Sequence, residues 1–223
     1  MYDYYAFFWF LCASILVRSL YVFVDQWLTP KNPKYNALPR FRKMYIQKNF
    51  IKSFMLAFLT IYSAFKIVIP IAKNDVWDTW TIHRLAAIYV ANDFTGLVSV
   101  DKLPKTTQIH HIITTVLVFV SWSIDFQTSD IGQAMFVYTT ASSAAYIVNL
   151  HLAVRWLWPR EALRWLRGIA GIIYVLTCGI SWSWHVWWAF TRAHFNLGHV
   201  FYFLLLGWIV RDDIILMQWL TKD

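Results

Sequence analysis

The chain is poor in the residues that mark most other protein classes. Only 14% of its 223 residues are charged, whereas soluble domains average about a quarter. Seven glycines and six prolines are too few for a collagen-like or low-complexity chain. Its two cysteines, Cys12 and Cys178, both fall inside apolar runs and give no disulfide framework. These absences exclude an ordinary soluble domain and a fibrous chain, and they leave the redox compartment undetermined.

Apolar and aromatic residues are abundant instead. Apolar residues make up 59% of the chain and aromatic residues 19%, which excludes intrinsic disorder. The net charge of +8 does not point to a nucleic-acid partner, because basic residues collect in loops on one face of a membrane protein. The composition therefore predicts an integral membrane protein whose first partner is the lipid bilayer.

Seven apolar segments are long enough, or nearly so, to cross a bilayer. A transmembrane helix needs about 20 mostly apolar residues. The segments are 4–24, 50–72, 81–100, 107–124, 131–157, 168–190 and 197–220. The expected fold is therefore all-α, with seven transmembrane helices.

Lysine and arginine are concentrated in three alternate connections, 25–49, 101–106 and 155–167. The connections between them contain only Lys73 and Arg192, alongside several aspartates. Basic loops of membrane proteins face the cytosol. The expected orientation has a lumenal or external N-terminus and a cytosolic C-terminus.

Polar residues in four of the predicted helices share a depth. With a rise of 1.5 Å per residue, each lies roughly 10–12 Å below the basic face. They are Asp93, His110, His111, Asn149 and Asp212. A charged side chain at the bilayer centre costs about 2.5–3.5 kcal/mol on insertion scales, so such groups face the protein interior. The pattern predicts a polar cavity that opens towards the cytosol.

The predicted cavity contains residues suited to acid–base or nucleophilic chemistry. Adjacent residues on a helix point about 100° apart, so one of His110 and His111 is expected to face the cavity and the other to bond a neighbouring helix. Imidazole serves as a base or nucleophile near neutral pH, and Asp93 is suited to orient it. Adjacent histidines chelate a metal poorly, so neither a metal site nor a tightly bound cofactor is expected. Such pairs also simply join helices, and that interpretation stays open.

Four segments carry a resemblance to a known family. They are YVANDFTGL (89–97), KTTQIHHIITTVLVF (105–119), SSAAYIVNLHLAVRW (142–156) and WIVRDDIILM (208–217). Their Tyr-x-x-x-Asp, His-His, Asn and Trp-x-x-x-Asp elements resemble those of the TLC-domain family, which includes the ceramide synthases. The resemblance covers roughly residues 45–220.

The resemblance implies a six-helix barrel preceded by one extra helix. Residues 1–49 would form the N-terminal helix and a basic loop, and 50–220 the TLC domain, with a lipid or fatty acyl chain bound inside. In ceramide synthases a histidine of the pair takes part in acyl transfer from acyl-CoA, in the endoplasmic reticulum, to a sphingoid amine. The implied catalytic residues are His110, His111 and Asp93. The implied substrate-binding residues are Tyr89, Asn149, His151, Trp208 and Asp212.

One departure from the ceramide synthase pattern leaves two functions open. Those enzymes carry further acids about 27 residues after the His pair, where this chain has Val137, Tyr138 and Ala141. The alternatives are acyl-CoA-dependent N-acyl transfer and a non-catalytic role in lipid binding, lipid sensing or membrane structure. A homodimer is left open. A retinal protein is excluded, because 197–220 lacks the Schiff-base lysine of that class.

Overall fold

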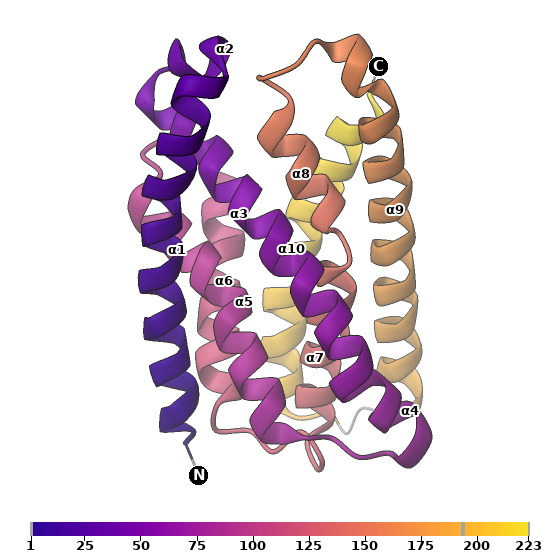
Figure 1. Cartoon of the computed structure of the whole chain (residues 1–223). Coiled ribbons are helices and arrows are strands. Elements are labelled where there is room, and N and C mark those ends of the chain that lie inside the picture. The colour runs from indigo at the N-terminus through magenta and orange to yellow at the C-terminus, as the bar shows by residue number, and fades with distance from the viewer. Residues whose placement is uncertain (1, 193–194, 223) are drawn as a thin grey trace.

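The computed structural model describes residues 2–192 and 195–222, and within these ranges every regular element is a helix (Figure 1). The all-α class is therefore confirmed. The elements are α1 (Tyr4–Lys31), α2 (Pro33–Asn36), α3 (Arg40–Ser63), η1 (Ala64–Val68), α4 (Ile69–Asn74), α5 (Thr79–Ser99), α6 (Lys105–Ser121), α7 (Asp130–Ser143), α8 (Tyr146–Val154), α9 (Arg160–Thr191) and α10 (Leu197–Thr221).

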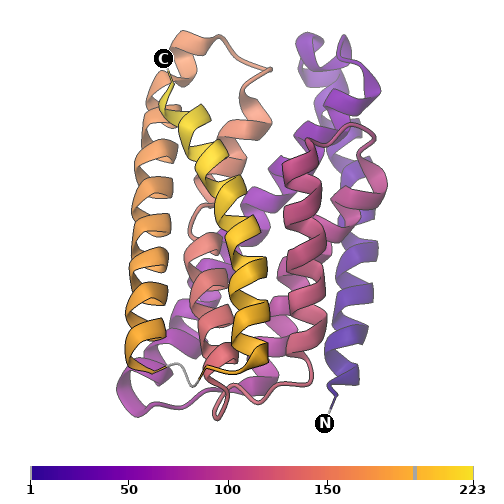
Figure 2. The same cartoon turned by 180° about the vertical axis from the view of Figure 1, so that it is seen from behind.

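The helices form a closed ring with one helix outside it. Going round the ring, α3 packs on α5, α5 on α6, α6 on α10, α10 on α9, and α9 on α7 and α8, which return to α3. The view from behind shows α10 and α6 side by side (Figure 2). Helix α1 lies outside, against α5 and α3, and the two termini lie at opposite ends of the bundle (Figure 1).

A stripe of buried side chains attaches α1 to the ring. Its buried residues recur every three or four positions, as expected of one helix face. They are Ala6, Phe10, Ala13, Val17, Tyr21, Val24 and Leu28. The Phe10 ring centroid lies 5.1 Å from those of Phe94 and Phe119. Asp3 caps the helix, because its carboxylate accepts hydrogen bonds from the amides of Tyr5 and Ala6.

The three basic connections meet at one end of the bundle. Val100 and Leu103 pack in one buried cluster with Leu28, Tyr35 and Leu157, which come from the other two connections. At the opposite end, Thr79 donates a hydrogen bond to Asp125, and the amide of Trp77 donates one to Gln127. The structure thus sorts the connections into the two groups that the charge pattern predicts.

Helix α3 begins ten residues earlier than predicted. It starts at Arg40 and continues through η1 and α4 to Asn74, because no proline or glycine interrupts residues 40–69. Residues 40–49, predicted as part of a basic loop, are helical. The predicted boundary between 49 and 50 therefore falls inside a helix, and Lys48 belongs to the ring wall.

The predicted segment 131–157 is two helices. Helix α7 ends at Ser143 and α8 begins at Tyr146. Hydroxyl groups before the break bond to the preceding turn: Thr139 Oγ1 donates to the carbonyl of Met135, and Ser143 Oγ to that of Thr140. Such bonds compete with the helix ladder and bend helices, which explains the break in this Ser/Thr-rich stretch.

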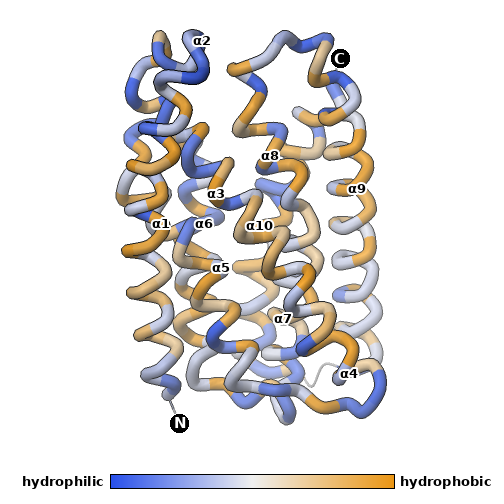
Figure 3. Tube along the Cα trace, in the orientation of Figure 1, coloured by the Kyte–Doolittle hydropathy of each residue, from blue (hydrophilic) through white to orange (hydrophobic). Residues whose placement is uncertain are grey.

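In the described part of the chain, three helices are long and apolar enough to cross a membrane: Tyr4–Lys31, Arg40–Asn74 and Arg160–Thr191. Of the others, α6 has 17 residues, and α10 carries Arg211, Asp212 and Asp213 in its second half. Hydrophilic residues gather around α2 and beyond α4, whereas much of α1 and α9 is apolar (Figure 3). The structure supports a possible membrane character, and the count of seven crossings stays a prediction.

Candidate functional site

A cavity of about 350 Å³ lies inside the ring. Its wall comes mainly from α3, α6, α8 and α10, with Ser142 and Tyr174 added by α7 and α9. Leu56, Val148, Leu152, Ile215 and Leu216 form an apolar part of the wall. Lysine, histidine, asparagine and aspartate side chains form the rest, so the cavity has both a hydrophobic and an ionisable lining.

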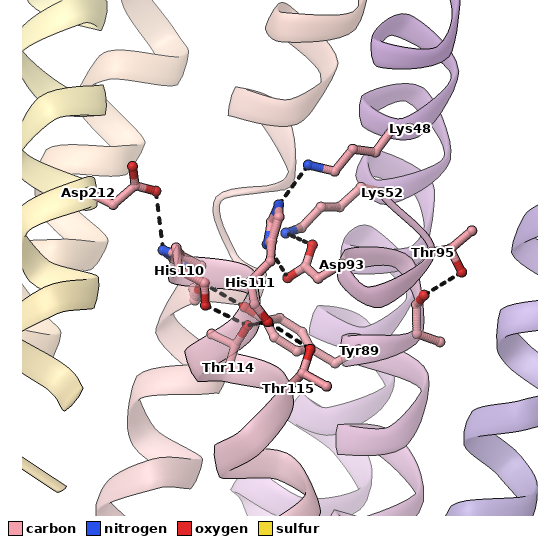
Figure 4. A network of polar contacts seen from close by, with 12 residues as sticks. Lys48, Lys52, Tyr89, Asp93, Thr95, His110, His111, Thr114, Thr115 and Asp212 are labelled. Carbon is pink, nitrogen blue, oxygen red and sulfur yellow. Dashed lines mark hydrogen bonds and ion pairs between the residues drawn. The ribbon is translucent and has the colours of Figure 1, made fainter. Parts of the chain in front are cut away.

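His111 lies at the centre of a buried chain of charges. Its Nδ1 is 3.2 Å from Asp93 Oδ2, at ion-pair distance, and its Nε2 is 2.7 Å from the Nζ of Lys48 (Figure 4). The other oxygen of Asp93 accepts a 2.5 Å hydrogen bond from Lys52 Nζ. Three helices, α3, α5 and α6, each contribute to this group, and the Asp93 side chain is fully buried.

His110 makes a separate pair with α10. Its Nδ1 lies 3.3 Å from Asp212 Oδ2, and its ring stands at 81° to that of His111 (Figure 4). Both histidines line the cavity, and each also reaches a different neighbouring helix. Each ring thus combines the two roles, facing the cavity and pairing with a neighbouring helix, that the sequence pattern allowed to be divided between the two histidines.

A glycine on α5 makes room for Lys48. A Cβ atom at Gly96 would lie 2.8 Å from Lys48 Cε, closer than real Cβ contacts allow. The lysine stem therefore lies directly against the backbone of α5. Lys52 is four residues further along α3, and residues at this spacing share a helix face. The two lysines consequently enter the interior together.

Asp213 forms a second buried polar group beside the cavity. Its two oxygens accept hydrogen bonds from the hydroxyls of Tyr138 and Tyr174, at 2.7 and 2.8 Å. The carboxylate comes from α10, and the two phenols that donate to it come from α7 and α9.

The remaining predicted site residues differ in their position relative to the cavity. Asn149 lines the cavity. Tyr89 is buried behind the cavity wall, with its hydroxyl 3.1 Å from the Oγ of Ser142, which lines the cavity. His151 is buried outside the lining, with its ring 5.8 Å from that of Trp219.

Trp208 is 49% exposed and lies under the Arg211 guanidinium, away from the cavity lining. The structure thus brings together Asp93, His110, His111, Asn149 and Asp212 and leaves Trp208 apart.

Sequence reasoning missed Lys48 and Lys52. Lys48 falls in the predicted basic connection 25–49, and the depth pattern gives Lys52 no role. The available signal was their spacing: two lysines four residues apart in the otherwise largely apolar stretch YIQKNFIKSFML lie on one helix face. Buried lysines are rare unless they are paired, so this face had to meet polar partners.

The paired histidines and carboxylates of the cavity are suited to proton transfer and carbonyl chemistry. Among the described residues no three His, Cys, Asp or Glu side chains are grouped to hold a metal ion. Because His110 Nδ1 faces Asp212 and the ring lines the cavity, Nε2 is the nitrogen placed to accept a proton from a ligand or to attack its carbonyl carbon. In comparisons with known proteins, no family model, no curated protein and no solved structure matches the chain.

Proposed function

We propose that this chain is a seven-span membrane protein of TLC type that binds a lipid or fatty acyl chain in the cavity and affects membrane lipid composition. One observation carries the proposal: a cavity of about 350 Å³ combines an apolar wall with His110 and His111, each facing a carboxylate. Ligand cavities are typically apolar with a few polar groups that orient the ligand. The proposed location is the endoplasmic reticulum, with a lumenal N-terminus and a cytosolic C-terminus.

The outer surface of α1 supports the membrane setting. Ile15 is 68% exposed and Phe23 61% exposed, whereas the opposite face of the helix is buried. Contiguous exposed apolar surface is rare on soluble monomers and marks a contact with lipid or protein. Lipid tails would cover this face.

Acyl transfer through His110 is the proposed chemistry. Its Nε2 would attack the thioester carbonyl of an acyl-CoA, and the CoA thiolate would leave. An amine would then attack the acyl carbon, the C–N bond to His110 would break, and the released Nε2 would accept the proton that the amine loses. Asp212, 3.3 Å from Nδ1, would stabilise the positive charge on the ring. His111 has both ring nitrogens against other side chains, so it and Asp93 would hold the site in shape.

A non-catalytic lipid-binding role is the second candidate. The observation that favours it is that both histidines already face carboxylates from neighbouring helices, as side chains that only join helices would. In that role the cavity would hold a lipid without changing it.

Native mass spectrometry of the full chain, released from nanodiscs, tests lipid binding. The wild type should retain one lipid, and Leu152→Trp or Leu216→Phe should lose it by filling the cavity. Ile172→Trp, at an exposed position on α9, is the matched control and should retain the lipid. No retained lipid in the wild type, or equal retention in all four proteins, would contradict the proposal.

The His110→Ala variant separates the two candidate functions. An acyltransferase should lose acylated-amine product from membranes supplied with acyl-CoA while keeping its bound lipid. An unchanged amount of product together with an unchanged bound lipid would contradict acyl transfer and support the non-catalytic role.

A further inference from the structure

Lys48 is a buried amine without an acidic partner. Its side chain is almost fully inaccessible, and none of the carboxylates in the described residues pairs with it. Asp93, the carboxylate in this group, is bonded to Lys52. Burying an ammonium group without a counter-charge is costly. The site therefore favours a ligand that reacts with the neutral amine.

The neighbours of Lys48 form the arrangement of an activated nucleophile. Lys48 Nζ lies 2.7 Å from His111 Nε2, and Asp93 faces the other nitrogen of the ring at 3.2 Å (Figure 4). A nucleophile within hydrogen-bond reach of a base, with a third group that orients the base, is the signature of covalent catalysis. Lysines activated in this way attack aldehydes and ketones to form Schiff bases.

We propose that Lys48 captures the carbonyl group of a long-chain aldehyde or ketone as an imine inside the cavity. The inference rests on the lipid-binding cavity proposed above but does not depend on acyl transfer through His110. Lys48 lines the same cavity as Leu56, Val148 and Leu152, so a hydrocarbon chain on that wall brings its carbonyl end to the amine. Gly96 holds the position open, because a side chain there would displace the lysine.

The reaction balances with the groups present. The Lys48 ammonium gives a proton to His111 Nε2, and the free amine forms a C–N bond with the carbonyl carbon. The carbonyl electron pair moves to oxygen, which takes up a nitrogen proton to give a carbinolamine. His111 then returns its proton to the hydroxyl, water leaves, and the protonated imine gives its proton to His111 Nε2, so that a neutral imine remains. An ester or thioester would instead give a stable amide, so a reversible site selects aldehydes and ketones.

Reductive trapping tests the proposal. The full chain in nanodiscs is incubated with limiting hexadecanal and sodium cyanoborohydride, and the alkylated lysine is located by peptide mass spectrometry. Lys48 should carry the hexadecyl group and should react at least about tenfold faster than the exposed Lys34 and Lys102, because His111 acts as its base. Without the reductant, dilution should restore the unmodified protein.

Variants separate the roles of the residues. Lys48→Arg keeps the charge but cannot form an imine, so the adduct should disappear. His111→Gln should slow trapping at Lys48 about tenfold or more. Lys102→Arg, on the exposed turn, should trap like the wild type. The comparison among lysines within the wild type remains decisive if a variant fails to fold.

The outcomes distinguish this inference from the proposed function. Alkylation spread over exposed lysines with Lys48 unmodified overturns the imine proposal, and native mass spectrometry then shows whether the lipid site stands without it. Loss of both Lys48 trapping and lipid retention overturns both.

Discussion

Asp93 is the buried carboxylate that pairs with both Lys52 and His111. It is completely buried, and it faces Lys52 on one oxygen and His111 on the other. Removing one partner of a buried ion pair is far more costly than replacing both, because the remaining charge is left without compensation. The stability of the site should therefore be strongly non-additive.

A double-mutant cycle measures this coupling. Lys52→Met alone should lower the free energy of unfolding by about 3–5 kcal/mol, and Lys52→Met with Asp93→Asn should recover part of that loss. The measurement is reversible unfolding in detergent micelles. Losses that simply add would show that Lys52 and Asp93 do not interact in the folded protein.

The site was predictable at some residues and not at others. Asp93, His110, His111 and Asp212 could be found because a charged or polar group in an apolar helix is conspicuous and costly. Lys48 could not, because it follows a run of basic residues that resembles a loop, and only the true start of α3 at Arg40 places it inside. Trp208 matched a motif, but its helix face points away from the cavity lining.

At the scale of the elements, hydrophobic pattern located most helices and local hydrogen bonding determined their interruptions. Segment 81–100 corresponds to α5 and 197–220 to α10 within a few residues. The break between α7 and α8 was missed because residues 134–148 carry only apolar, small or hydroxyl side chains. The hydroxyl-to-carbonyl bonds that bend the chain leave no hydropathy signal.

Asp125 connects elements at the end opposite the basic connections. Its Oδ1 accepts hydrogen bonds from the Thr79 hydroxyl, at the start of α5, and from the backbone amide of Gln127. These bonds stabilise the charged form and hold the pKa of Asp125 below its ordinary value. The stabilisation is therefore fully present above the unfolded-state pKa of about 3.9 and is lost as the pH falls through the lower folded-state pKa.

Asp125→Asn tests this connection. Between about pH 5 and pH 3, the melting temperature of the wild type should fall further than that of the variant, because the variant has no carboxylate at position 125 to protonate. Thermal unfolding across this range is the measurement. Parallel pH profiles for the two proteins would show that the turn contributes no acid-sensitive stability.

At the scale of the whole molecule, the ring and the sorting of its connections predict how the chain crosses a membrane. Lys34 and Lys102 belong to connections at one end, and Val76 and Gln127 to connections at the other. All four are exposed. Helix α1 begins at one end of the bundle and α10 ends at the other, so a bundle that spans a membrane as proposed would cross it an odd number of times (Figure 1).

Single cysteines at these four positions, in a background with Cys12 and Cys178 replaced by serine, test the topology. In sealed vesicles a membrane-impermeant maleimide should label Lys34→Cys and Lys102→Cys from the same side. Val76→Cys and Gln127→Cys should react only after the vesicles are opened. If the protein is inserted in the opposite orientation, the two pairs should exchange these behaviours. Labelling of all four from one side would contradict a seven-span protein.

Photo-crosslinking with a diazirine-bearing fatty acid tests most directly whether the cavity is a lipid site. The probe is added to the full chain in nanodiscs, irradiated, and located by peptide mass spectrometry. We predict crosslinks at Leu56, Val148 and Leu216 in the wild type, and their loss in Leu152→Trp. Crosslinks confined to outward-facing side chains such as Ile15 and Ile172, and unchanged by Leu152→Trp, would contradict the account.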